Sequence, residues 1–207
     1  MRVEVISAVP HSTVTCAALS RRANSVFLLD RPMKFFHWKT ALNRFRAPPP
    51  SHRTLLKVVD VVSGRESRNL SGHSLPITSI AAGKSSVYSW YTGSLDCSWS
   101  QWDTRMHPSK VLSARTAGAV RSVALSPGDR FVAVGSDSSI QLFDARQRAY
   151  VKQFNYSGRK LEFNPTEVLL SAVGNDRVVR FFCLETFELV SQSDAFVDDV
   201  QASVFRL

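Results

Sequence analysis

The sequence lacks the features that would place it in several common protein classes. No uninterrupted apolar stretch approaches the roughly 18 residues that a membrane-spanning helix needs, and the N-terminus has no apolar secretory core. The three cysteines, Cys16, Cys97 and Cys183, are widely separated, which indicates neither a disulfide framework nor a zinc site. With 44% hydrophobic and 21% charged residues, the composition is typical of a globular protein. We therefore expect a cytoplasmic protein without a membrane partner.

Acidic residues are scarce at the N-terminal end. Residues 1–53 hold nine Arg and Lys against two acidic residues, whereas the remainder holds 17 against 15. Residues 31–53 carry six positive charges, no acid and four aromatic residues, and include three consecutive prolines. This basic segment is predicted to be a loop that contacts an acidic surface; the alternative is an insertion without function. The candidate contact residues are Lys34, Lys39, Arg44 and Arg46.

One short pattern recurs along the rest of the chain. In each copy, an Asp preceded by small residues is followed six positions later by an aromatic residue. The pairs are Asp96 and Trp102, Asp137 and Phe143, and Asp176 and Phe182. Each copy ends one residue after the aromatic, at Asp103, Asp144 and Cys183, and a fainter copy ends at Asp60. These end positions are 43, 41 and 39 residues apart, close to the period of about 40 to 45 residues of a propeller blade. The segments between them alternate as short strands with Gly, Pro, Asp and Asn breaks.

Several of these segments resemble the WD-repeat family and, within it, the non-catalytic regulatory subunits of katanin, the microtubule-severing complex. The resemblance is strongest in VRSVALSPGDRFVAVGSDSSIQLFDAR (120–146) and NDRVVRFFCLETFELVS (175–191). The Trp-Asp dipeptide typical of the family is intact only at 102–103, and Gly-His only at 72–73. The family's C-terminal domain, which binds the catalytic subunit, has no counterpart here, so we expect the ATPase to be held by a larger complex.

The predicted fold is all-β, a partial WD40-type β-propeller of about four blades plus the first strand of a fifth, with the basic insertion in the first blade. An open ring of this kind leaves its end faces available to another chain. The expected blades are 8–62 with the insertion at 31–53, 71–105, 116–146, 157–186, and the start of a fifth at 195–207.

The resemblance also implies roles for individual residues. In a WD blade, His, Ser or Thr, Asp and Trp form a buried hydrogen-bond network, and the set expected here is His73, Ser79, Asp96 and Trp102. The equivalent core positions of the next two blades are Asp137, Phe143, Asp176 and Phe182.

The same residues could be interpreted as a hydrolase triad, but no GxSxG nucleophile elbow accompanies them. No Gly-rich phosphate-binding pattern is present, and the remaining histidines lie far apart. We therefore expect no catalysis, no cofactor and no metal.

Two functions from different classes remain. The first, implied by the resemblance, is a scaffold that targets or regulates a microtubule-severing AAA ATPase complex at microtubules, centrosomes or spindle poles, with tubulin acidic tails as partners. The second is an RNA- or ribosome-associated WD scaffold that uses the basic segment on phosphates. Microtubules without acidic tails and excess RNA would distinguish them.

Overall fold

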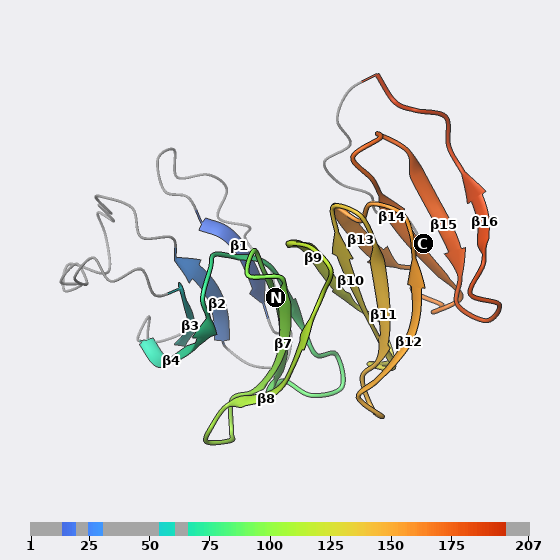
Figure 1. Ribbon diagram of the computed structural model, residues 1–207. Coiled ribbons are helices and arrows are strands. Elements are labelled where there is room, and N and C mark those ends of the chain that lie inside the picture. The colour runs from blue at the N-terminus through green and yellow to red at the C-terminus, as the bar shows by residue number, and fades with distance from the viewer. Residues whose placement is uncertain (1–13, 20–24, 31–53, 61–65, 198–207) are drawn as a thin grey trace, which may run out of the picture.

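The computed structural model describes residues 14–19, 25–30, 54–60 and 66–197. In these residues, four antiparallel sheets of four strands each follow one another along the chain, and they stand side by side in space (Figure 1). Within each sheet the strands are joined in sequence order. The predicted all-β fold class is confirmed, with several four-stranded sheets arranged as part of a propeller.

Sheet 1 contains β1 (Val14–Leu19), β2 (Ser25–Asp30), β3 (Thr54–Asp60) and β4 (Glu66–His73). Sheet 2 contains β5 (Ile77–Ala82), β6 (Ser89–Ser94), β7 (Ser98–Asp103) and β8 (Lys110–Arg115). Sheet 3 contains β9 (Val120–Leu125), β10 (Phe131–Ser136), β11 (Ile140–Asp144) and β12 (Ala149–Phe154). Sheet 4 contains β13 (Lys160–Phe163), β14 (Leu169–Val173), β15 (Val179–Cys183) and β16 (Leu189–Gln192).

The sheets extend further toward the C-terminus than the blades expected from the sequence. Each expected blade ended near the Asp-to-aromatic pattern of the third strand, whereas each of sheets 2 to 4 continues into a fourth strand, β8, β12 or β16. These outer strands are only partly apolar, and their residues are half-buried in most of β8 and exposed in most of β12 and all of β16. Their hydrophobic periodicity is therefore too weak to mark them as strands.

Two predicted features fall mainly outside the described residues. The basic segment 31–53 lies between β2 and β3 and is not among them. The start of a fifth blade was expected at 195–207; residues 195–197 form no strand, and 198–207 lie outside the described part of the chain.

The core lies between neighbouring sheets. One cluster between sheets 1 and 2 includes Leu56, Trp90 and Trp102, and a second joins sheets 2 and 3. The third joins sheets 3 and 4 around Phe182. Central strands contribute to two clusters at once because successive side chains point to opposite faces. In β10, Val132 and Val134 face sheet 2, whereas Phe131 and Ala133 face sheet 4.

Candidate functional site

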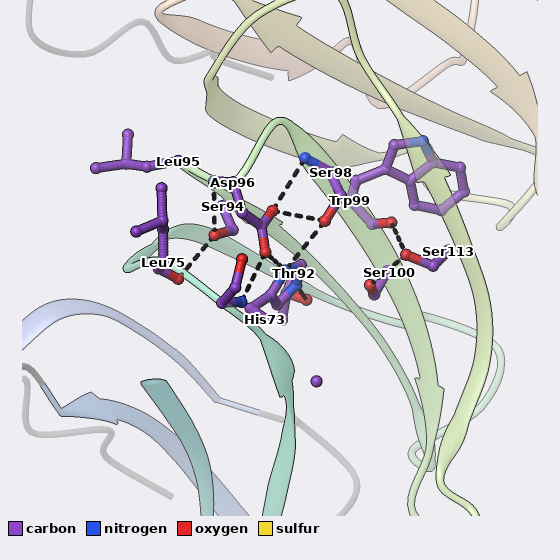
Figure 2. A network of polar contacts seen from close by, with 12 residues as sticks. His73, Leu75, Thr92, Ser94, Leu95, Asp96, Ser98, Trp99, Ser100 and Ser113 are labelled. Atoms are coloured by element: carbon purple, nitrogen blue, oxygen red, sulfur yellow. Dashed lines mark hydrogen bonds and ion pairs between the residues drawn. The ribbon is translucent and has the colours of Figure 1, made fainter. Parts of the chain in front are cut away.

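A buried polar network joins sheet 1 to sheet 2 (Figure 2). His73 is the last residue of β4 in sheet 1, while Thr92 lies on β6 and Trp102 on β7 of sheet 2. The Nε2 atom of His73 lies 2.8 Å from Thr92 Oγ1, and Trp102 Nε1 donates to the same oxygen at 2.7 Å. On the other side of the ring, His73 Nδ1 is 3.0 Å from Asp96 Oδ2. The network is thus a tie between two sheets.

The donors and acceptors in this series of hydrogen bonds specify the protonation state of His73. The indole nitrogen of Trp102 can only donate, so Thr92 Oγ1 accepts from it and has one hydrogen left to give to His73 Nε2. His73 Nε2 must then be an acceptor, which leaves the proton on Nδ1 to be donated to Asp96. All of these hydrogen bonds can form together only when His73 is neutral.

Four donors surround the Asp96 carboxylate. Besides His73, the backbone amide of Ser74 donates to Oδ2 at 2.9 Å, and the amide and hydroxyl of Ser98 donate to Oδ1 at 3.0 and 2.6 Å. Asp96 occupies the β6–β7 turn, where an Asp side chain readily accepts from an amide two residues on. The turn therefore presents the carboxylate directly to the end of β4.

The pKa values of the two central groups follow from these surroundings. Burial lowers the pKa of His73, and the opposing hydrogen bond and charge of Asp96 do not overcome it. Burial raises the pKa of Asp96, but the hydrogen bonds from Ser98 and Ser74, together with His73, outweigh this effect and hold the pKa below its usual value. A neutral imidazole therefore lies beside an ionised carboxylate at neutral pH.

Thr92, His73 and Asp96 follow the order hydroxyl, imidazole and carboxylate of a hydrolase triad. Their burial, however, keeps a substrate from reaching the hydroxyl. Thr92 has no exposed surface, and its hydroxyl both accepts from Trp102 and donates to His73. A nucleophile needs an accessible oxygen beside a vacant position for the reacting atom. The network is suited to fixing the positions of β4, β6 and β7 rather than to chemistry.

The prediction that Ser79 belongs to this network is wrong. Ser79 lies on β5 and accepts instead from the backbone amide of Val123 on β9, at 3.0 Å. Ser122 makes the same link one sheet further on, accepting from the amide of Leu161 at 3.2 Å. Each serine accepts a hydrogen bond from a backbone amide on the first strand of the following sheet. That strand lies at the edge of its sheet, so its outer amides have no neighbouring strand to pair with. Thr92 takes the expected role of Ser79.

Thr92 could have been found by counting back from the turn. The register pairs Trp90 with Trp102 and Thr92 with Ser100, so Thr92 and Trp102 share a face of the hairpin. Period-two counting from Asp96 would have placed a hydroxyl on this face. Ser98, the second polar residue that the sequence reasoning missed, lies two residues after Asp96.

The equivalent positions of sheets 3 and 4 divide into two groups. Phe143 and Phe182 are buried like Trp102 and pair with Val132 and Leu170 in the corresponding register. The acidic residues are not core positions, in contrast to the prediction. Asp137 and Asp176 have side chains that are 42% and 46% exposed and pair with arginines, because neither sheet offers a histidine at the end of the preceding strand.

The predicted partner-binding residues Lys34, Lys39, Arg44 and Arg46 lie outside the described residues. Among the residues that are described, no group of three or more His, Cys, Asp or Glu side chains could hold a metal ion. A search of the same residues finds no helix with the length and apolarity to cross a membrane.

Residues 64–103 and 106–144 match the family model WD40, described as WD domain, G-beta repeat. Both stretches are similar to WD repeats. Each matched stretch begins with the outer strand of one sheet and continues through the first three strands of the next. A WD repeat is therefore offset by one strand from a sheet, and His73 and Trp102 fall within one repeat although they belong to different sheets.

A comparison with curated proteins gives no match. The WD repeats indicate a protein-interaction scaffold with protein partners, and WD domains are typically non-catalytic. The closed network around His73 is consistent with that general role.

Proposed function

We propose that this WD-repeat chain is a non-catalytic scaffold that targets or regulates a microtubule-severing AAA ATPase complex at microtubules and centrosomes. The observation that carries the scaffold part is the match of two stretches to WD repeats within neighbouring four-stranded sheets, together with the polar network of the first stretch, which is enclosed as a tie between sheets. The severing complex is suggested by the resemblance of residues 120–146 and 175–191 to katanin regulatory subunits.

The proposed microtubule contact is the basic segment. Its six cations without an acid complement the acidic tails of tubulin, and such a contact would be weakened by salt because exposed charges are screened. The cellular location that follows is the cytoplasmic cytoskeleton, at microtubules, centrosomes or spindle poles.

Microtubule co-sedimentation of the full chain at low salt tests this contact. We expect binding to intact microtubules, loss of binding when the acidic tails are removed by proteolysis, and loss in a variant with Lys34, Lys39, Arg44 and Arg46 changed to Gln. A control variant changes the exposed Arg115, Lys152 and Lys160 to Gln and should retain binding.

The same assay addresses the RNA alternative. Excess single-stranded RNA that abolished all binding, while removal of tubulin tails had no effect, would favour an RNA-associated scaffold. Co-purification from cells then asks whether the severing ATPase or RNA accompanies the chain. A preparation that contained neither the ATPase nor tubulin would contradict the proposal.

A further inference from the structure

A basic and aromatic surface lies on one side of sheets 2 and 3. In sheets 2 to 4, the turns that join the first to the second strand and the third to the fourth strand lie at the lower end of each sheet in Figure 1, and we call them the lower rim. We define the lower-rim patch as Lys84, Tyr88, Arg105, Arg130 and Arg148, all of which are exposed.

The turns that carry the patch form one continuous surface. Within sheet 2, the amide of Thr104 donates to the carbonyl of Tyr88 at 3.0 Å, and within sheet 3 the amide of Ala145 donates to the carbonyl of Arg130 at 2.7 Å. Between the sheets, Asp129 accepts from the amide of Lys84 at 2.8 Å and from the amide of the next residue. The bonds from the backbone amides to the Asp129 carboxylate hold the two halves of the patch side by side.

Acidic residues in this region are engaged by the protein itself. Asp129 accepts from the two amides of the neighbouring sheet. Asp144 accepts from the amides of Arg146 and Gln147 at 2.9 and 2.7 Å, and Asp103 pairs with Arg105.

The basic residues are engaged much less. Among the described residues, neither Lys84, Arg130 nor Arg148 forms an ion pair with a carboxylate. The carboxylates therefore stabilise turns, while these three cations remain available to a partner.

Tyr88 and Arg105 form a fixed pair within the patch. The guanidinium of Arg105 lies 4.7 Å from the centre of the Tyr88 ring and is held by Asp103, with contacts of 2.7 and 3.1 Å. Nevertheless, Tyr88 is 44% exposed and the Arg105 side chain 61% exposed. Tyr and Arg are enriched at the energetic centres of protein interfaces, and a pair that is already ordered loses little entropy on binding.

Neither sheet 4 nor the opposite rim, where the structure describes them, shares this character. At the lower rim of sheet 4, the residue equivalent to Tyr88 and Arg130 is Val168. The turn between β15 and β16, on the same rim, presents Glu185 and Glu188. On the opposite rim, Arg121 and Arg180 pair with Asp137 and Asp176. Among the described residues, the patch is therefore a feature of sheets 2 and 3, and exposed acidic residues lie beside it on sheet 4.

We propose that the lower-rim patch binds an acidic peptide segment of a partner protein, with carboxylates on Lys84, Arg130 and Arg148 and an apolar side chain against Tyr88. A peptide fits better than a nucleic acid because the three engaged carboxylates within the same surface disfavour a continuous polyphosphate, whereas spaced acidic side chains can avoid them. This inference goes beyond the microtubule role and does not depend on it.

Fluorescence anisotropy with the full chain provides the test. The probe is a labelled peptide of Glu residues with one central Phe, and its counterpart has Gln in place of Glu. The test variant changes Lys84, Arg130 and Arg148 to Gln, and the matched control changes Arg115, Lys152 and Lys160 to Gln, all exposed positions. A third variant carries the four Gln substitutions in the basic segment 31–53, and circular dichroism checks that each is folded.

We expect the test variant to bind the acidic peptide about tenfold more weakly, with less than about a twofold change in the control. The Gln peptide should not bind, and Tyr88→Ala should weaken binding only when the peptide contains Phe. Equal losses in test and control variants, or a loss confined to the 31–53 variant, would overturn the proposal. Stronger competition by poly(U) RNA than by the unlabelled acidic peptide would also overturn it, without bearing on microtubule co-sedimentation.

Discussion

Sheets 2 and 3 share one architecture but use equivalent residues differently. In both, an Asp lies in the turn between the second and third strands, six positions before a buried aromatic residue. In sheet 2, Asp96 is enclosed and receives four hydrogen bonds. In sheet 3, Asp137 remains exposed and forms a surface pair with Arg121.

The difference originates in two neighbouring positions. Thr92 of sheet 2 corresponds in register to Val134 of sheet 3, and His73 precedes sheet 2 at the end of β4. Without the hydroxyl and the imidazole, sheet 3 is held by apolar packing around Val132, Val134 and Phe143. A blade can therefore be stabilised either by a fully satisfied hydrogen-bond network or by apolar packing, whereas a partly satisfied network lowers the free energy of unfolding.

The largest effect is expected from Thr92→Val, which gives sheet 2 the residue found in sheet 3. The substitution removes the bridging oxygen and leaves the indole of Trp102 and the Nε2 atom of His73 buried without partners. We expect a loss of about 2 to 4 kcal/mol in the free energy of unfolding, measured by urea denaturation. The reciprocal Val134→Thr should also destabilise, because its hydroxyl enters an apolar cluster; unchanged stability in Thr92→Val would show that the network contributes little.

The paired substitutions Asp96→Asn and Asp137→Asn compare the two turn carboxylates directly. Asp96→Asn should reduce the free energy of unfolding by about 1 to 3 kcal/mol, because an amide cannot accept from all four donors. Asp137→Asn should cost at most about 1 kcal/mol, since it removes an exposed ion pair. Thermal unfolding of both variants gives the comparison, and equal losses would contradict the distinction between the two sheets.

Acid should weaken sheet 2 through His73. Because burial lowers the pKa of His73 in the folded protein, the unfolded chain binds a proton more readily, and stability falls as the pH drops below the unfolded value of about 6.5. Asp96, whose folded pKa is also lowered, adds a further loss near and below pH 4. Urea denaturation between pH 7.5 and 5 should show a smaller pH dependence in His73→Gln; identical slopes would indicate that His73 does not titrate differently on folding.

The smallest effect concerns the turn after the third strand. Asp103 and Asp144 accept backbone amides there, while sheet 4 has Cys183, whose pKa is lowered chiefly by the amides of Thr186 and Glu185. Cys183→Asp should raise the melting temperature slightly, because a carboxylate is a stronger acceptor than a thiol. Calorimetry measures the shift, with Cys183→Ser as the control, and a lower melting temperature would be the contrary result.

Local spacing predicted much of the fold. The constant interval from Asp to aromatic marked three hairpins and located Trp102, Phe143 and Phe182, all of which are buried. The outer strands escaped prediction because solvent on one side removes the apolar periodicity. Of the expected network, His73 contacts Asp96 directly and is linked to Trp102 through Thr92, which strand alternation could have identified.

The sequence by itself determined the register within each hairpin, since strand alternation and turn chemistry act over a few residues. Only the tertiary structure decided which groups meet between sheets. Ser79 contacts Val123 because sheet 3 packs beside β5, and Asp129 reaches the amide of Lys84 across the same boundary. These contacts span more than 40 positions, and the distance between their partners is set by how the sheets pack, which no local pattern specifies.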